Sequence, residues 1–320
     1  MAYSGKDREQ LWFYDTVKEV DDNAWIIGGE ALISRHNSKP PQPYWEGDQG
    51  SYFTMTQAPS PKPTTRRISD SCPIKDAILK SCKWKGLYRI GNAYLSVSAN
   101  RGAQEHNTLE ALKDSSFNFM VPTEYCHAVY GRLYHIVYSV LPGKSLVEVW
   151  PKTKDRDLRR KWTLQIAETY LQLSNWHNDR ICGVDGGNLA HHWAVRESRI
   201  DPDSHTHEAL IRNFKTVGMD CSEFVFAHNR MMPLSFMVDE SNELVGIFMW
   251  EDAGFVPKDW VRTMTRANAF TESTILLHYH QWADPQDLDD WETLIEDALI
   301  EKGFREFWEN FVNWRGGRLN

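Results

Sequence analysis

Two neighbouring stretches decide the fold that this sequence predicts: Phe224-Val-Phe-Ala-His-Asn-Arg-Met-Met-Pro-Leu-Ser-Phe-Met-Val-Asp239 and Val245-Gly-Ile-Phe-Met-Trp-Glu-Asp-Ala-Gly-Phe-Val-Pro257. In each stretch an apolar run of strand type leads into a loop, and the chain then becomes apolar again. The first loop carries a histidine and an arginine, and the second carries two adjacent carboxylates. Groups of these kinds can transfer protons or hold an anion.

Before these stretches the chain reads mainly as strands. Ala24 to Arg35 and Gly86 to Ala99 each run through apolar residues on both sides of a glycine-containing turn, which predicts two hairpins. A helix is predicted from Ala103 to Lys113, and an apolar strand from Leu133 to Leu141.

The second half of the chain reads as helices. Asp157 can cap a helix that runs to about His177 with apolar residues at a spacing of four, and Asp284-Pro285 starts another that ends before Gly303. A last amphipathic helix carries Phe304, Phe307, Trp308, Phe311 and Trp314. The change from strands to helices near Pro142-Gly143 predicts a bilobal α+β fold. Residues 1–142 would form a small β-rich lobe with an N-terminal extension, and residues 143–320 a larger helical lobe.

Charge and composition exclude several classes of partner. The formal charge of −8 and the pI near 5.8 argue against nucleic acid, which needs a basic surface. The N-terminus is too polar for a signal peptide and no stretch approaches a membrane span, so we expect a cytoplasmic protein without a membrane partner. The five cysteines are scattered and the twelve histidines supply no third ligand at a fixed spacing, so no metal site is expected. The oligomeric state is not predicted.

The two quoted stretches resemble the catalytic core of aminoglycoside phosphotransferases, a branch of the kinase-like superfamily. The likeness is greatest to the forms common in filamentous fungi, FVFxHxDLxPxNIIVD and VGIIDFExAGFxP. It extends to Trp25–Pro43, to Glu105–Leu112, and to the turn Gly183–Gly187. The resemblance covers nearly the whole chain and implies the bilobal, protein-kinase-like fold.

The family's catalytic groups are replaced at three positions of this chain. In the family, an Asp two residues after the His is the general base, an Asn five residues later holds magnesium, and an Asp in the next strand chelates it. Here these positions hold Arg230, Ser235 and Met249. Matching residues on both sides of each position fix the register.

The phosphate-binding lysine is missing as well. The strand that should carry it reads Ala93-Tyr-Leu-Ser-Val-Ser98, and no lysine lies between Lys85 and Lys113. Glu105, which resembles the acidic partner of that lysine, remains without it. The resemblance therefore implies the family's fold. The replaced base, metal ligands and lysine imply that phosphoryl transfer has been lost.

The replacements predict that no magnesium-dependent phosphoryl transfer occurs. A general base contributes roughly 10² to 10⁴ in rate. A guanidinium at position 230 about 4 Å from a divalent ion would be repelled by on the order of 8 kcal/mol at an effective dielectric near 20. We therefore expect neither a metal nor another cofactor.

The same residues can form a different site. Arg230 could hold a carboxylate, enolate or phosphate, with His228, Glu251 or Asp252 moving the proton, so these four are the catalytic candidates. The expected partner is a small molecule. If Arg230 binds it, the group that it contacts should be anionic. The substrate-binding candidates are Ser235, Met249, Trp250, Glu105 and Asp185.

Each candidate also has a structural interpretation. His228 can brace its loop, Glu251 can order the next one, and Asp252 can be a solvated surface acid. Arg230 can turn outward and pair with an acid. Asp185 can shape the glycine-rich turn in which it lies.

Three functions remain open on the sequence. The first is a repurposed, metal-free small-molecule enzyme of specialised metabolism, performing a cyclisation or isomerisation by acid–base or electrostatic catalysis. The second is a non-catalytic pseudokinase that acts by binding or as a scaffold, and the third is a residual phosphotransferase. An enzyme should hold Arg230 and a titratable group of shifted pKa in a pocket, whereas a scaffold should close the old cleft.

Overall fold

The computed structural model describes residues 16–76, 85–100, 102–113, 115–196, 202–266, 282 and 284–319. The expected N-terminal extension, residues 1–15, lies outside them. The chain divides into two compact units, Met1–Asn100 with Pro122–Val140 and Arg101–Val121 with Leu141–Asn320. The sequence predicted that the second lobe begins at residue 143; the second unit resumes at Leu141, two residues earlier, and also takes in residues 101–121.

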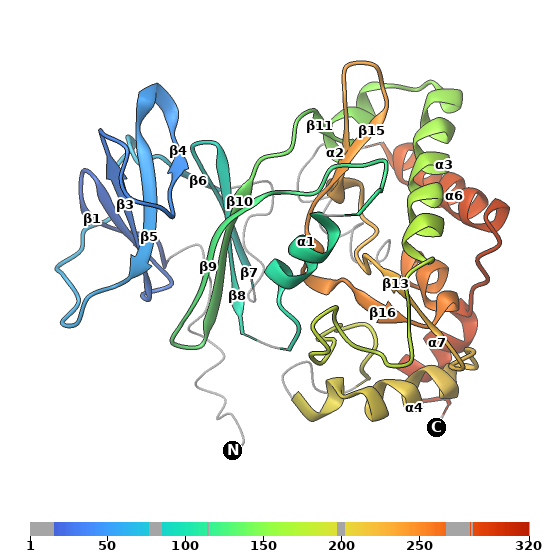
Figure 1. The fold of residues 1–320 in the computed structure, drawn as a ribbon. Helices are drawn as coiled ribbons and strands as arrows, with labels where there is room; N and C mark the ends of the chain where they lie inside the picture. Colours follow the sequence, from blue (N-terminus) through green and yellow to red (C-terminus); the bar gives the residue numbers. More distant parts are fainter. Residues whose placement is uncertain are drawn as a thin grey trace. The chain divides into compact units, whose positions relative to one another are not determined.

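The first unit consists of two antiparallel five-stranded sheets (Figure 1). The first sheet has the order β1-β2-β3-β5-β4, and the second has the order β6-β7-β8-β10-β9. The predicted hairpins are confirmed as β2–β3 and β7–β8. The strands of the first sheet are β1 (Lys18–Asp21), β2 (Ala24–Ile27), β3 (Ala31–His36), β4 (Trp45–Glu46) and β5 (Tyr52–Gln57). Those of the second are β6 (Ile74–Asp76), β7 (Lys85–Ile90), β8 (Ala93–Ala99), β9 (Glu124–Tyr130) and β10 (Leu133–Ser139).

An apolar core between the two sheets holds the first unit together. Trp25, Trp45 and Phe53 of the first sheet are buried in one cluster with residues such as Leu95 of the second. The Trp45 indole donates to the carbonyl oxygen of Ile90 at 2.9 Å and so ties the sheets by a polar contact as well. Burying large aromatic side chains of this kind contributes about 1.5–3 kcal/mol each.

The second unit is mainly helical, with short strands in two three-stranded sheets, ordered β11-β14-β15 and β12-β13-β16. Among the described residues, its helices include α1 (Glu105–Lys113), α2 (Leu146–Val149), α3 (Arg156–Leu173), α4 (His207–Val217), α6 (Pro285–Glu301) and α7 (Trp308–Arg315), and residues 258–266 are helical as well. Its described strands are β11 (Lys144–Ser145), β12 (His177–Asn178), β13 (Phe224–Ala227), β14 (Phe236–Val238), β15 (Leu244–Ile247) and β16 (Gly254–Val256). The 3-10 helices with described bounds are η3 (Asp48–Gly50), η4 (Trp150–Lys152), η5 (Pro202–His205), η6 (Pro233–Ser235) and η7 (Trp250–Asp252). A strand-rich part followed by a helix-rich part confirms the predicted α+β class.

The observed helix ends agree with those predicted from the sequence, except at two helices. Asp284 caps α6 by accepting from the backbone N–H of Gln286, as predicted. The prediction that Asp157 caps α3 is wrong, because Asp155 accepts from the backbone N–H groups of residues 157 and 158. The last helix, expected from Phe304, begins at Trp308. In the described ranges, no helix is long and apolar enough to cross a lipid bilayer.

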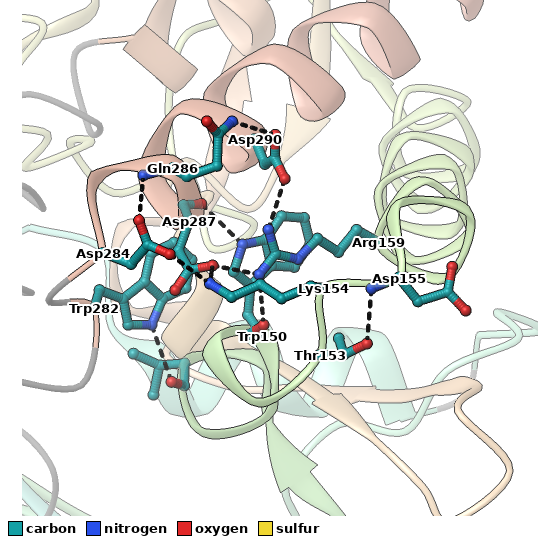
Figure 2. A network of polar contacts seen from close by, with 11 residues as sticks. Trp150, Thr153, Lys154, Asp155, Arg159, Trp282, Asp284, Gln286, Asp287 and Asp290 are labelled. Carbon is teal, nitrogen blue, oxygen red and sulfur yellow. Dashed lines mark hydrogen bonds and ion pairs between the residues drawn. The ribbon is translucent and has the colours of Figure 1, made fainter.

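A buried ion-pair network joins α3 to the start of α6 (Figure 2). Arg159 of α3 is fully buried; its guanidinium contacts the carboxylate of Asp287 and lies 2.7 Å from that of Asp290. Lys154 adds ion pairs to Asp284 at 2.8 Å and to Asp287 at 2.5 Å. Because a charge in the interior is stable only when it is paired, these contacts fix the relative position of the two helices.

We expect Arg159→Met to lower the free energy of unfolding by about 3–5 kcal/mol, since it removes the one buried cation of the network and leaves the buried Asp287 with only the half-exposed Lys154. The neighbouring residue provides a matched control. Arg160 pairs with Glu301, and both side chains are about half exposed, so Arg160→Met should cost no more than about 1 kcal/mol. Chemical denaturation measures both; equal losses would contradict the role assigned to Arg159.

Candidate functional site

The two loops predicted to carry the site run between the same two small sheets. The first leads from β13 to β14 and the second from β15 to β16. β13 pairs with β16 in one sheet, and β14 pairs with β15 in the other. The two loops therefore cross between the same two sheets in opposite directions. The backbone N–H of Phe248 donates to the carbonyl oxygen of Ser235 at 3.0 Å and joins the loops directly.

Each loop contains a buried residue in the left-handed backbone region. Asn229 has φ 59° and Met249 has φ 70°. Asn adopts this conformation more readily than most residues, whereas for methionine it costs roughly 1–2 kcal/mol. Backbone strain of this kind collects at ligand sites and switches, so the loops remain the first candidate for a functional site.

Arg230 forms two ion pairs with the second loop. Its Nη1 lies 2.6 Å from Oε1 of Glu251 and 3.2 Å from Oδ2 of Asp252. The three side chains are only 20%, 19% and 15% exposed, respectively. With all three ionised the group carries a net charge of −1, so the positive charge expected to hold an anion is already neutralised. This geometry agrees with the alternative in which Arg230 has a structural role and pairs with acids.

His228 lies beneath this group and is fully buried. Its Nε2 donates to the carbonyl oxygen of Phe248 at 3.0 Å, and the edge of its ring meets the Trp250 ring at a centroid distance of 4.6 Å. Burial lowers the pKa of His228 to about 4. The imidazole is therefore neutral at pH 7 and braces one loop against the other.

The predicted substrate-binding residues of these loops are also buried. The Ser235 hydroxyl donates to the carbonyl oxygen of Arg230 at 3.2 Å, and the Trp250 indole donates to that of Ile247 at 2.9 Å. The Trp250 ring stacks on Phe119 and Phe226 at centroid distances of 6.1 and 6.5 Å. These contacts make the residues part of the packed interior of the second unit.

Glu105 accepts a hydrogen bond from the second loop. It is the first residue of α1 and is buried, and its Oε1 accepts from the backbone N–H of Trp250 at 2.9 Å. The acidic residue that the sequence left without its lysine thus holds the second loop.

Asp185 holds the start of the same helix. It is exposed, and its Oδ2 accepts from Nδ2 of Asn107 at 2.8 Å and from the backbone N–H of Gln104 at 3.4 Å. Its Oδ1 accepts from the backbone N–H of Gly187 at 2.9 Å, which shapes the turn. A carboxylate at a helix N-terminus is stabilising, so Asp185 anchors α1 through its first turn.

The residues at the family's metal positions do not fit a divalent cation. Mg²⁺ takes carboxylate and other oxygen ligands, whereas Met249 offers a buried thioether and the Ser235 hydroxyl donates to a backbone carbonyl. The two nearby carboxylates are engaged by a guanidinium. Among the described residues, no group of three or more His, Cys, Asp or Glu side chains could hold a metal.

Two surface hollows of the second unit lie elsewhere. One, of about 610 Å³, lies along α6 and is lined by residues that include Arg262, Trp291 and Glu296. The other, of about 590 Å³, follows α3 and includes Phe119 and Lys161. None of the nine predicted site residues lines either hollow.

Comparison with known proteins finds no matching protein family and no similar curated protein. The solved structures that are similar to this chain include aminoglycoside phosphotransferases, as the resemblance predicted. An aminoglycoside-3'-phosphotransferase of type VIII is 13% identical with a TM-score of 0.41, over 70% of this chain and 94% of that one. The ADP-bound APH(2'')-Ib is 11% identical with a TM-score of 0.37, over 72% and 82%. The streptomycin–ATP complex of APH(2")-IIa is 12% identical with a TM-score of 0.40, over 76% and 87%. No activity is transferred from likenesses at this level.

The sequence reasoning overlooked two residues of the site. Phe119 stacks on Trp250 from a segment that carried no motif. Asn229 occupies the left-handed position directly before Arg230, and an asparagine in a loop is a usable signal for that conformation.

The pKa of His228 predicts an acid-sensitive fold. The folded protein keeps this imidazole neutral down to about pH 4, while the unfolded chain takes up the proton near pH 6.5. Unfolding therefore binds a proton in this window, and stability falls as the pH drops from about 6.5 to 4, by on the order of 3 kcal/mol for this residue. His228→Gln should have a shallower pH dependence than the natural chain in denaturant titrations at pH 7.5 and 5. An unchanged slope would contradict the assignment.

The ion pairs of Arg230 predict a structural penalty on removing the guanidinium. Arg230→Met removes the guanidinium that Glu251 and Asp252 share, and we expect a loss of about 1–3 kcal/mol, below the value for fully buried pairs because all three groups are partly exposed. The matched control is the triple variant Arg230→Met, Glu251→Gln, Asp252→Asn, which should regain most of that loss. A single variant with natural stability would contradict the pairing.

Proposed function

We propose that this chain acts as a non-catalytic binding protein built on the phosphotransferase fold. The observation that carries the proposal is the double ion pair of Arg230 with Glu251 and Asp252, at 2.6 and 3.2 Å. The sequence analysis put the repurposed enzyme before the binding protein. We now put the binding protein first, because the enzyme would need the Arg230 guanidinium for a ligand.

The absence of phosphoryl transfer is part of this proposal. Phosphoryl transfer depends on positioning and on metal ions that neutralise the developing charge. Arg230, Ser235 and Met249 supply neither a general base nor a metal ligand, and Lys85–Lys113 contains no internal lysine. These four independent replacements support the loss of kinase chemistry.

The closure of the two loops supports a binding role. The two ion pairs of Arg230 and the His228–Phe248 and Phe248–Ser235 hydrogen bonds hold them together, and the bond from Trp250 to Glu105 ties the second loop to α1. A catalytic site needs groups that change protonation or move toward a substrate, whereas a binding protein benefits from one rigid arrangement. We propose a small molecule as the ligand, with neither nucleic acid nor a membrane as partner, and a cytoplasmic location.

A repurposed, metal-free enzyme is the second candidate function, and a different observation supports it. The side chains of Glu251 and Asp252 remain 19% and 15% exposed, so a ligand can reach part of each. An acid beside a guanidinium can donate or accept a proton during a cyclisation or isomerisation, as in specialised metabolism. For this function, a ligand must displace one of the two acids from Arg230.

Calorimetry tests the loss of kinase chemistry. We expect no binding of ATP with magnesium to the natural chain, since Arg230 replaces the base, Ser235 and Met249 replace the metal ligands, and the guanidinium engages the two nearby carboxylates. Arg230→Asp, Ser235→Asn and Met249→Asp together should recover weak magnesium binding with little phosphoryl transfer, because the lysine is still absent. Low-micromolar ATP affinity that disappears with EDTA would refute the proposal.

A second experiment separates binding from catalysis. A thermal-shift screen of carboxylate, polyketide-like and terpenoid small molecules identifies ligands, and each ligand is then incubated with the protein and analysed by mass spectrometry. The binding protein returns every ligand unchanged. Conversion of a ligand that is abolished by Glu251→Gln or Asp252→Asn, with binding retained, would establish the enzyme instead.

A further inference from the structure

A long loop, residues 58–73, joins β5 to β6 in the first unit. All of its residues are described, and apart from an isolated bridge between Arg66 and Glu19 they form neither helix nor strand. Every residue from 64 to 71 is exposed, so this stretch contributes no side chain to the buried core. Long loops of this kind in compact domains are commonly functional.

The exposed stretch, residues 64–71, carries two arginines before a serine, in the order Arg66-Arg67-Ile68-Ser69. Arginine-directed serine kinases recognise guanidinium groups three and two residues before the hydroxyl, because carboxylates in the kinase groove bind them. The pattern is short, and only its structural context makes it usable. A kinase needs a substrate segment that is exposed and not helical, and this stretch meets both conditions.

The Ser69 side chain lies at the surface of the molecule. Its Oγ is 3.0 Å from Oγ of Ser71, which is also exposed. The hydroxyl therefore takes no part in core packing, and a phosphate added to it would not displace packed apolar groups.

The backbone of Ser69, in contrast, is held by a buried carboxylate. Glu19 of β1 has a side chain that is only 2% exposed. Its Oε1 accepts from Nη2 of Arg66 at 2.6 Å and from Nε at 3.1 Å. Its Oε2 accepts from the backbone N–H of Ser69 at 2.8 Å. One carboxylate thus holds the exposed stretch against β1 through the arginine and through the serine.

We propose that Ser69 is a phosphorylation site for an arginine-directed serine kinase, and that its phosphate releases the exposed stretch from Glu19. The Ser69 Oγ attacks the γ-phosphorus of ATP held by the kinase, the bond from that phosphorus to the β-phosphate oxygen breaks, and ADP leaves. The hydroxyl proton passes to the kinase. The site belongs to the first unit, whereas the β13–β14 and β15–β16 loops belong to the second, so the proposal does not depend on the function of those loops.

The release follows from charge. A phosphate brings about −1.5 to −2 charges, and it would be attached to the residue whose N–H binds the Glu19 carboxylate. The two anions repel each other, and the phosphate competes with Glu19 for the Arg66 guanidinium. Glu19 is buried, so a shared cation would leave its charge incompletely balanced.

The kinase can reach Ser69 without unfolding the unit. The side chains of Arg66 and Asp22 are 57% and 85% exposed, so the ion pair between them is weak. Local openings of exposed segments cost far less than global unfolding. A phosphate added in the open state opposes closure, and phosphorylation therefore converts a transient opening into a lasting one.

Mass spectrometry of the full chain tests the site, after incubation with a purified arginine-directed serine kinase, ATP and magnesium. We expect a phosphate on Ser69 that is lost in Ser69→Ala. Ser71→Ala is the matched control from the same stretch and should be modified like the natural chain. Arg67→Gln should slow the reaction about tenfold, the value of one charge-assisted hydrogen bond. A natural chain without phosphate on Ser69, or an unchanged rate in Arg67→Gln, overturns the site.

Hydrogen exchange of the phosphorylated and unmodified chains tests the release. The backbone N–H groups of Glu19, Arg66 and Ser69 donate in the bonds that hold the stretch, so peptides containing them should exchange about tenfold faster after phosphorylation. The β2–β3 hairpin is the internal control and should be unchanged, which separates release from unfolding. Glu19→Gln removes the repelled charge and should reduce the difference between the two forms. Equal exchange in both forms of the natural chain overturns the release.

Discussion

A single guanidinium, that of Arg230, pairs with the carboxylates of Glu251 and Asp252. It connects the β13–β14 loop to the β15–β16 loop, which the strand pairs bring near each other. The strand pairs β13–β16 and β14–β15 determine that the loops run in opposite directions. The ion pairs then determine their separation, because two partly buried acids cannot stay together without a cation. The neutral His228 fills the space beneath, and the Trp250 ring closes the arrangement against Phe226.

The arrangement continues from the loops into α1. The backbone N–H of Trp250 binds Glu105, the first residue of α1, and the same end of the helix is held by Asp185 through Asn107 and Gln104. A displacement of the second loop would thus disturb a buried carboxylate and, through it, the first turn of the helix. Buried histidines add a common sensitivity to acid, since burial lowers the pKa of His191 to about 3 and those of His135 and His228 to about 4.

The order of strands and helices could be predicted from the sequence because it depends on local signals. The glycine turns, the Asp284-Pro285 start and the apolar stripes act over a few residues. Asp155 and Asp157 show the limit of that reasoning: both can cap a helix, and in the structure Asp155 is the cap, with its own backbone N–H donating to the Thr153 hydroxyl. The sequence offered an acid as the partner of Arg230 without choosing it, and the partner of Glu105 was not predicted. They lie 21 and 145 residues away along the chain, and only the tertiary structure brings them together.

The left-handed backbone at Met249 has a consequence for protein engineering. Aspartate and asparagine enter this conformation with less strain than methionine, so the path of the chain already suits an acid at this position. The obstacle is dehydration: the side chain at 249 is fully buried, and an ionised carboxylate there would lose its water without gaining a cation. A designer would therefore do better to open the packing around position 249 than to remodel the loop.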